Sequence, residues 1–242
     1  MAKTSGIVII GNEVLSGKTQ DINSHFFCTE LRQLGVEVKK ISTIQDEIEL
    51  IGREVLEFSQ RCDFVFTSGG IGPTHDDVTI EGIAHGFGVK VVRHPDIEAR
   101  MRRRLGTDLN EARLRMANVP EGAALLCAEA PFAPIVQMHN VYVFPGIPKI
   151  LQERFHAIKE LFRDAPYFLK NVYVRHGEGV IATMLNDLLV KFPELMLGSY
   201  PVLDLPEYKV KVTLESKDAE YLDRALKAFV ASLPQDSVQR IA

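Results

Sequence analysis

The segment of the chain that is richest in groups able to do chemistry covers residues 67–79 and reads TSGGIGPTHDDVT. Its glycines permit a tight turn and a close approach of the backbone to a ligand. A helix that starts after such a turn directs backbone N–H groups toward an anion. The segment contains neither GK[ST] nor GxGxxG, which excludes a Walker loop and a Rossmann loop. We therefore expect an anion-binding loop of another type.

Two adjacent carboxylates, Asp76 and Asp77, stand in this loop. Because carboxylates repel phosphate, they predict either a divalent cation that bridges them to a phosphate, or a ligand that offers N–H and O–H donors. In the alternative interpretation one of them caps the next helix, which leaves the other unexplained. His75 is a candidate for a phosphate contact or an acid, and an ordinary surface histidine is the equal alternative.

Polar residues also follow the other predicted strands. Gly11 and Glu13 come after the first apolar run, with Asp21 predicted to cap the following helix, and Asp46 comes after the second strand. Parallel strands end at the same edge of a sheet, where open α/β proteins bind their ligands. A set of capped βα loops accounts for some of these residues, but not for acidic or glycine-rich groups in every loop.

The elements that position these residues follow from the apolar periodicity. Short β-branched or aromatic runs at residues 6–10, 36–41 and 64–67 predict strands, and they alternate with amphipathic helices over residues 22–34 and 48–58. Such alternation indicates a parallel sheet with right-handed crossovers. Residues 135–138 and 141–144 predict a hairpin around His139-Asn140, followed by a helix from Pro148. The sequence therefore predicts an open α/β layer structure.

Two further segments interrupt or follow this pattern. Residues 96–116 form an arginine-rich insertion that either contacts phosphates or presents a solvated helix face. The chain then divides into residues 1–165 and a small α+β subdomain, residues 166–242, with the order β-α-β-β-α. That order resembles a KH module, but Gly177-Glu178-Gly179 is not the GxxG loop with which such modules clamp RNA.

The amino-acid composition restricts the classes of partner that this chain is expected to bind. The formal charge is −4, from 28 basic and 32 acidic residues, which argues against nucleic acid and against an anionic membrane. The cysteines, Cys28, Cys62 and Cys127, are odd in number and form no CxxC pair, so we expect reduced thiols in the cytoplasm. No stretch predicts a signal peptide or a membrane span. A small molecule is the expected ligand.

These residues together resemble a known family. Gly11, Glu13, Gly17, Asp21, Asn23, Asp46 and the motif GGxGPTxDDxT at residues 69–79 resemble the molybdopterin-binding fold of MogA- and MoaB-type proteins, in the variant found at the N-terminus of CinA-type proteins. The segments NVYVFPGIP at residues 140–148, LGSYP at 197–201 and YKVKVTL at 208–214 resemble the corresponding domain of eukaryotic FAD synthases. We expect this domain to stand alone, without a synthase or deamidase domain.

The resemblance implies a three-layer αβα fold with a mostly parallel sheet. It implies a metal-dependent pyrophosphatase that acts on FAD or ADP-ribose and releases AMP, with Mg²⁺, Mn²⁺ or Co²⁺ as the divalent metal and potassium as a second candidate ion. Asp46, Asp76 and Asp77 are the predicted catalytic and metal-binding residues. The predicted ligand-binding residues are Gly11, Glu13, Ser68, Gly69, Gly70, Gly72, Thr74, His75, Thr79, Gly146 and Pro148.

Other interpretations stay open. Where CinA-type proteins carry a GTAPG-like stretch, this chain has EAPFAP at residues 129–134, which separates it from the CinA substrate preference. The same fold serves cofactor-insertion proteins, so the alternative function is a non-catalytic molybdopterin or nucleotide binder of molybdenum cofactor biosynthesis. A regulatory or structural oligomer without chemistry is the third. The resemblance also implies a homo-oligomer, either a dimer or a trimer.

Overall fold

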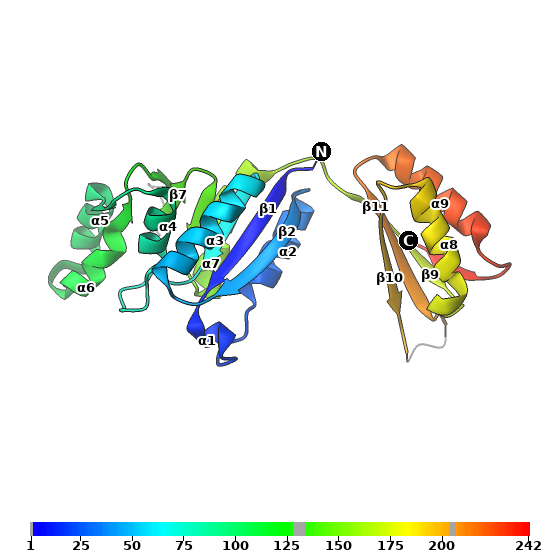
Figure 1. Cartoon of the computed structure of the whole chain (residues 1–242), viewed down its shortest axis with the longest axis horizontal. Coiled ribbons are helices and arrows are strands. Elements are labelled where there is room, and N and C mark those ends of the chain that lie inside the picture. Colours follow the sequence, from blue (N-terminus) through cyan, green and yellow to red (C-terminus); the bar gives the residue numbers. More distant parts are fainter. Residues whose placement is uncertain (1, 128–133, 204–206) are drawn as a thin grey trace. The chain divides into compact units, whose positions relative to one another are not determined.

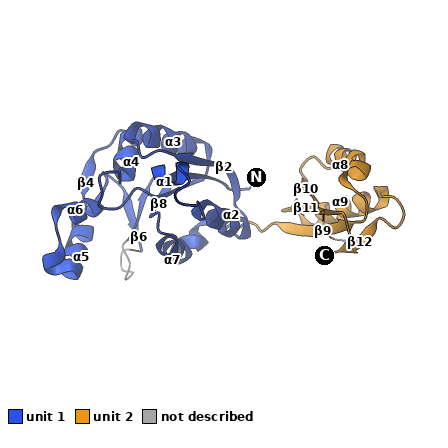
Figure 2. Cartoon of the chain, turned by 90° about the horizontal axis from the view of Figure 1, so that it is seen from below, with its two compact units in different colours: residues 1–164 blue, residues 165–242 orange. Residues whose placement is uncertain are grey.

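The structure is a computed structural model that describes residues 2–127, 134–203 and 207–242. The chain divides into two compact units, residues 1–164 and residues 165–242, coloured separately in Figure 2. Each unit has its own hydrophobic core. No helix in the described ranges is long and apolar enough to cross a membrane.

A mostly parallel sheet forms the middle of the first unit (Figure 1). Within the described residues its strands, in spatial order, are β2 (Glu37–Ile44), β1 (Thr4–Ile10), β3 (Phe64–Ser68), β8 (Val141–Phe144), β7 (Ile135–Met138) and β6 (Ala124–Leu126). The first four of these are parallel to one another, whereas β7 and β6 are antiparallel to their neighbours. The predicted three-layer α/β fold is therefore confirmed.

Helices cover both faces of this sheet, because successive side chains of a strand point to opposite faces. In β1, Ile7 and Ile9 pack in one core cluster with helices α2 (Asn23–Gln33) and α7 (Pro148–Ile158). Val8 and Ile10 pack in the other, with α3 (Ile48–Arg61) and α4 (Thr79–Phe87). A β-branched strand that is buried on both sides is typical of a parallel sheet, as the sequence predicts.

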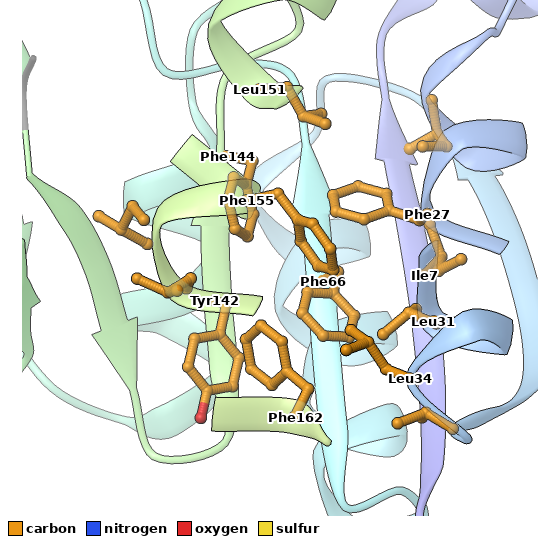
Figure 3. Packing of buried hydrophobic residues seen from close by; sticks show 14 residues of the cluster. Ile7, Phe27, Leu31, Leu34, Phe66, Tyr142, Phe144, Leu151, Phe155 and Phe162 are labelled. Carbon is orange, nitrogen blue, oxygen red and sulfur yellow. The ribbon is translucent and has the colours of Figure 1, made fainter. Parts of the chain in front are cut away.

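Aromatic rings fill the first of these clusters (Figure 3). Phe66 of β3 is fully buried, with its ring centroid 4.9 Å from that of Phe162, 5.7 Å from that of Tyr142 and 5.9 Å from that of Phe155. The Phe162 and Phe155 rings meet Phe66 edge to face, whereas the Tyr142 ring is stacked on it. Such aromatic pairs stabilise a core beyond the burial of area alone. These contacts pack α2 and α7 against one face of the main sheet.

The turns largely follow their predicted chemistry. The Asp21 carboxylate accepts hydrogen bonds from the N–H groups of Asn23 and Ser24, both at 3.0 Å, and so caps α2 as expected. The hairpin between β7 and β8 is also confirmed, but its positive φ, +52°, belongs to His139 and not to Asn140. Asn140 instead donates to the carbonyl oxygens of Ser59 and Cys62, which ties the turn to the end of α3.

The arginine-rich insertion is a small lobe with a sheet of its own. Its strands β4 (Val91–Arg93) and β5 (Asn118–Pro120) pair antiparallel, separately from the main sheet. Between them lie α5 (Pro95–Leu105), the 3₁₀ turn η1 (Gly106–Asp108), α6 (Glu111–Leu114) and the 3₁₀ turn η2 (Arg115–Ala117). The sequence predicts a helix in this segment but not β5, whose three residues are too few to show a period.

The second unit contains β9 (Phe168–Val174), α8 (Glu178–Lys191), β10 (Met196–Pro201), β11 (Val210–Ser216), α9 (Ala219–Ser232) and β12 (Val238–Ile241). Its antiparallel sheet has the order β10-β11-β9-β12. The predicted order β-α-β-β-α is therefore corrected by one further strand, β12, which pairs with the free edge of β9. Only tertiary pairing reveals it, because its four residues are half or fully exposed.

The remaining short elements flank the main sheet. They are the helix α1 (Asn12–Leu15), directly after β1, and the 3₁₀ turn η3 (Lys159–Phe162), which continues α7. The predicted helix from Pro148 therefore ends one turn earlier as an α-helix, and its last turn is of the tighter type. Phe162 in that turn is fully buried, which explains why the apolar pattern of the helix continues through it.

Candidate active site at the carboxyl edge of the sheet

Four loops meet at the edge where β1, β2, β3 and β8 end, because these strands are parallel. Asn12, in the first loop, donates its N–H to the Asp46 carboxylate in the second, at 2.8 Å. Asn23 donates its amide to the Ser68 hydroxyl at 3.0 Å and to the Gly146 carbonyl at 2.8 Å. These bonds join all four loops into one rim, as the polar residues after each strand predict.

The glycines of the third loop meet a requirement of the backbone. Gly69 has φ +109° and Gly70 has φ +61°, a region that residues with a Cβ rarely adopt. A Cβ on Gly69 would lie 2.0 Å from the Ile10 carbonyl oxygen, and one on Gly70 would lie 2.4 Å from the Thr79 hydroxyl. The loop therefore folds tightly over the end of β1.

Ser68 and Thr79 support this loop from beneath. Both are buried, at 2% and 0% exposure. The Thr79 hydroxyl donates to the Gly69 carbonyl at 2.9 Å, and its N–H donates to the Gly70 carbonyl at 3.0 Å. The Thr79 hydroxyl thus shapes the glycine turn, whereas the Ser68 hydroxyl accepts from the Asn23 amide and donates to the Pro145 carbonyl. The predicted ligand contacts of both residues stay predictions.

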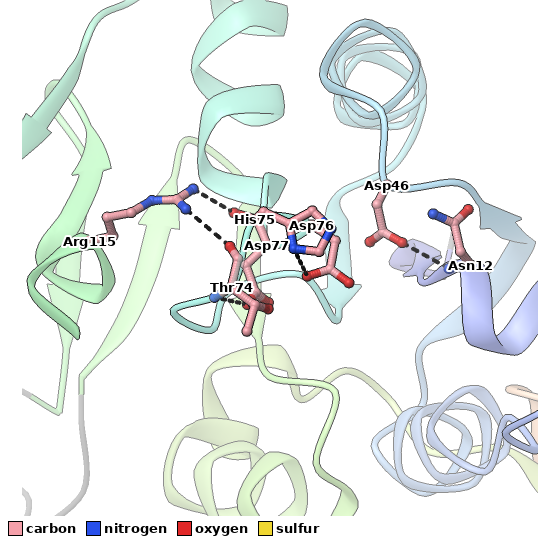
Figure 4. Close-up of polar contacts among 7 residues, drawn as sticks. All are labelled: Asn12, Asp46, Thr74, His75, Asp76, Asp77 and Arg115. Atoms are coloured by element: carbon pink, nitrogen blue, oxygen red, sulfur yellow. Dashed lines mark hydrogen bonds and ion pairs between the residues drawn. The ribbon is translucent and has the colours of Figure 1, made fainter. Parts of the chain in front are cut away.

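The Asp77 side chain forms hydrogen bonds within its own loop (Figure 4). Its carboxylate accepts hydrogen bonds from the Thr74 N–H at 2.8 Å and from the Thr74 hydroxyl at 2.5 Å. Gly72 leaves the room for it, because a Cβ there would lie 2.6 Å from an Asp77 carboxylate oxygen. Asp76 and His75 are exposed, with the His75 ring 3.9 Å from the Asp76 carboxylate. Of the adjacent pair, Asp76 is the more exposed, and a hydrogen bond from the Thr74 side chain lowers the pKa of its carboxyl.

Negative charge converges at this rim. Burial raises the pKa of the Asp46 carboxyl above its ordinary value, and the carboxylates of Glu13, Asp76 and Asp77 act in the same direction, while the N–H of Asn12 opposes them. The residues in which the sequence predicts chemistry therefore influence one another through space. Gly11 lies directly against the Glu13 carboxylate, since a Cβ on it would approach within 2.5 Å. Such mutual repulsion is relieved by a cation.

The donor set fits a hard divalent cation that the ligand helps to coordinate. Within the described residues no three His, Cys, Asp or Glu side chains are already assembled as a metal site. Mg²⁺ usually binds through one or two carboxylates, waters and the phosphates of a substrate, so a preformed cage is not required. Asp46 and Asp76, on neighbouring loops, supply oxygen ligands of the right kind. The predicted divalent metal stays a prediction.

Arg115, from the insertion, anchors the acidic loop. Its guanidinium donates to the carbonyl oxygens of Thr74 at 3.0 Å and Asp77 at 3.3 Å, and it pairs with Glu81 at 3.4 Å. Figure 4 shows the loop between Arg115 on one side and Asp46 on the other. The sequence offers Arg115 as a phosphate contact or a solvated residue. The structure shows that it positions the backbone of the loop.

Replacing Arg115 with Met is expected to lower the free energy of unfolding by about 1–2 kcal/mol, because three acceptors lose a charged donor. Amide hydrogen exchange in residues 74–77 is expected to become faster, since the loop loses its anchor. The matched control is Arg102→Met, which removes an exposed pair with Glu98 worth about 0.3–0.5 kcal/mol. Equal effects of the two variants on that loop would contradict the anchoring role.

Other predicted residues lie where expected. Pro148 occupies the first turn of α7, and Gly146 and Thr74 are exposed at the rim. Most of the stretch that departs from the CinA pattern, residues 129–133, lies outside the described residues. Sequence reasoning did not find the bridging role of Asn23 or the anchoring role of Arg115, since both depend on contacts between segments far apart in the chain.

Fold and site together define an open α/β protein that presents a glycine loop and carboxylates at the carboxyl ends of its parallel strands, the place where this class binds ligands. Residues 6–164 match the family described as "Probable molybdopterin binding domain", and residues 166–242 match the one described as "FAD synthase, middle domain". The chain belongs to the molybdopterin-binding domain family, and the predicted resemblance to CinA-type proteins and FAD synthases is confirmed.

Similarities to individual proteins agree with this family assignment. The chain is 33% identical to a "Probable FAD synthase" of Caenorhabditis briggsae, covering 91% of this chain and 48% of that protein, so it spans about half of that relative's length. A protein of Archaeoglobus fulgidus is 35% identical, covering 92% of this chain and 95% of its own length. A solved CinA structure from Thermoplasma acidophilum, of unknown function, has a TM-score of 0.61 at 28% identity, covering 67% of this chain and 100% of its own.

Proposed function

We propose that the first unit is a divalent-metal-dependent pyrophosphatase that hydrolyses FAD or ADP-ribose. Water attacks one phosphorus of the diphosphate and the P–O–P bond breaks, so FAD yields AMP and FMN, and ADP-ribose yields AMP and ribose 5-phosphate. The observation that carries the proposal is the convergence of Asp46, Asp76, Asp77 and Glu13 beside a glycine turn. Carboxylates repel a diphosphate unless a cation lies between them.

The residues of the rim have separable tasks in this proposal. Gly69 and Gly70 let the ligand approach the backbone, while Asp77 and Arg115 hold the loop in place. Asp46 and Asp76 would hold the metal, which when bound neutralises the diphosphate and makes its phosphorus more electrophilic. His75, exposed beside Asp76, is available to contact a phosphate oxygen or to supply a proton to the leaving group.

The family match supports the choice of substrates. The second unit resembles the middle domain of FAD synthase, and relatives over nearly the whole chain include proteins named as FAD synthases, which makes a flavin dinucleotide the first candidate. The second candidate function is non-catalytic binding of molybdopterin or a nucleotide. It is favoured by the description of the first unit's family.

AMP release from FAD and, in parallel, from ADP-ribose decides between these functions. Each substrate is incubated with the protein plus a chelator, or plus Mg²⁺, Mn²⁺ or Co²⁺, with and without potassium, and AMP is measured by chromatography. Turnover that requires a divalent metal supports the pyrophosphatase and ranks its substrates. Saturable binding without AMP release under every condition would instead support a non-catalytic binder.

A divalent cation is also expected to stabilise the protein through Asp46. At a concentration about tenfold above the Kd, binding adds about 1.4 kcal/mol, or roughly 3–6 °C in the Tm of the first unit. In chelator, Asp46→Asn is expected to unfold at the same temperature as the wild type or slightly higher, because the amide keeps the Asn12 N–H bond and removes repulsion. Equal stabilisation of both proteins by the cation would contradict a role for Asp46 as ligand.

The expected assembly and location remain part of the proposal. We propose a homo-oligomer of two or three copies, for which light scattering should give a mass of a multiple of 27.1 kDa. A cytoplasmic location is supported by Cys28, Cys62 and Cys127, all of which are free thiols. A mass equal to the monomer would contradict the oligomer.

A further inference from the structure

A pocket opens beside the glycine loop of the first unit. Gly70, Gly72 and Asp77 line it, and so does Arg115. The side chain of Arg154, which comes from α7, lines it as well. The pocket therefore brings a second arginine, 77 residues along the chain from Asp77, to the loop that carries the predicted chemistry.

Arg154 occupies an unusual position for a charged side chain. Its neighbours along the helix, Leu151 and Phe155, are fully buried in the aromatic core. Its Nε atom is buried and has no hydrogen-bond partner. Burial also lowers the pKa of the Arg154 guanidinium. No ion pair found among the described residues includes it.

The other groups of the pocket have partners already. Arg115 donates to two carbonyl oxygens and to Glu81. The Asp77 carboxylate accepts two hydrogen bonds from Thr74. Arg154 is thus the cation of this pocket with a buried N–H group, at Nε, that has no partner within the described part of the chain.

A buried N–H group without an acceptor costs free energy, and buried polar groups in native proteins usually have a partner. An arginine keeps its charge when buried, so an anion is the partner that satisfies it best. Its planar fork matches two oxygens of a phosphate group. Gly70 and Gly72 line the same pocket, so an anion bound there would lie beside the backbone of the glycine loop.

We infer that Arg154 binds a phosphate group of the ligand inside this pocket, opposite the glycine loop. The identity of the ligand as a dinucleotide diphosphate rests on the proposed function, whereas the requirement for an anion rests on Arg154 itself. In this arrangement Asp46 and Asp76 would bind the cation at the rim, and Arg154 would bind the phosphate oxygens directly. Arg154 is in this sense a binding residue and not the source of the nucleophile.

Calorimetric titration of the full chain with inorganic pyrophosphate tests this inference, with Mg²⁺ present because the carboxylates beside the pocket repel a diphosphate in the absence of a cation. Arg154→Met keeps most of the apolar stem and removes the charge, and Arg154→Lys keeps the charge but not the fork. We expect a Kd for pyrophosphate raised about 10- to 100-fold in Arg154→Met and by a smaller factor in Arg154→Lys. The matched control is Arg163→Met, an exposed arginine paired with Glu160, which should bind as the wild type does.

Thermal unfolding separates binding from a structural role. If Arg154 has no partner in the chain, Arg154→Met unfolds at the same temperature as the wild type or higher. The inference is overturned if wild-type protein does not bind pyrophosphate, if Arg154→Met binds it within about twofold of wild type, or if the variant loses several degrees of Tm.

The experiments distinguish failure of the proposed hydrolase activity from failure of the inference about Arg154. If the wild type releases no AMP but pyrophosphate binding depends on Arg154, the phosphate-binding role of Arg154 is supported and the proposed hydrolase activity is wrong. If the wild type releases AMP and Arg154→Met does so with unchanged KM and kcat, the hydrolase stands and the role of Arg154 is wrong. If the hydrolase activity and the phosphate-binding role of Arg154 are both correct, Arg154→Met raises KM for FAD or ADP-ribose more than it lowers kcat. Arg154→Lys then has a KM between those of Arg154→Met and the wild type.

Discussion

The double variant Asp46→Asn/Asp76→Asn is expected to release AMP at least about 100-fold more slowly than the wild type, and to remain folded. These two carboxylates lie on neighbouring loops of the rim, close enough for Asp76 to raise the pKa of Asp46. Removing their charges takes away the oxygen ligands of the predicted cation. Both are partly or fully exposed, so the amides fit without repacking the core.

The measurement is the initial rate of AMP release with saturating metal, and circular dichroism checks the fold. Asp187→Asn, an exposed carboxylate on α8 in the second unit, is the matched control and should keep full activity. Asp77→Asn alone is expected to reduce the rate as well, while still accepting the Thr74 N–H through its amide oxygen. Activity within about threefold of wild type in the double variant would remove these carboxylates from the mechanism.

Gly69→Ala is expected to lower the free energy of unfolding by more than about 2 kcal/mol and to abolish ligand binding. An alanine there would need φ +109° and would place its Cβ 2.0 Å from the Ile10 carbonyl oxygen. Backbone atoms at the end of β1 cannot move aside as a flexible side chain can. The loop must therefore shift away from the sheet and take its ligand-facing backbone with it.

Gly146→Ala provides the matched control from the same rim. A Cβ at this position would lie 3.5 Å from the Gly69 Cα, an ordinary van der Waals distance, and Gly146 is exposed. Its cost is expected to stay below about 0.5 kcal/mol. Chemical denaturation of both variants checks the prediction. Similar stabilities for Gly69→Ala and Gly146→Ala would mean that the turn does not require glycine.

Much of the fold follows from local patterns. The continuous apolar run at residues 6–10 predicts a strand buried on both faces, and Ile7 and Val8 indeed pack in opposite clusters. The motif at residues 67–79 predicts a glycine turn between a strand and a helix, which the structure has. Both signals are local, because the period of an apolar run and the conformational freedom of glycine are properties of neighbouring residues.

The candidate site was predictable only in part. Asp46, Asp76 and Asp77 were found because parallel strands end at one edge, so residues after each strand must meet there. The division of labour between the adjacent carboxylates was not, since it depends on the Thr74 N–H that turns back onto Asp77. The strand β12 escaped prediction for a related reason, because it is specified by the free edge of β9.

By itself the sequence determined the layer order, the glycine turn, the edge at which the candidate site lies and the family of the protein. The tertiary structure decided which side chains reach that edge from a distance. Asn23 joins three loops, Arg115 anchors the acidic loop, and Arg154 lines the pocket with a buried Nε that has no partner among the described residues. The physical reason is that a hydrogen bond or a buried charge depends on position in space, and residues far apart in the chain share no local pattern that records it.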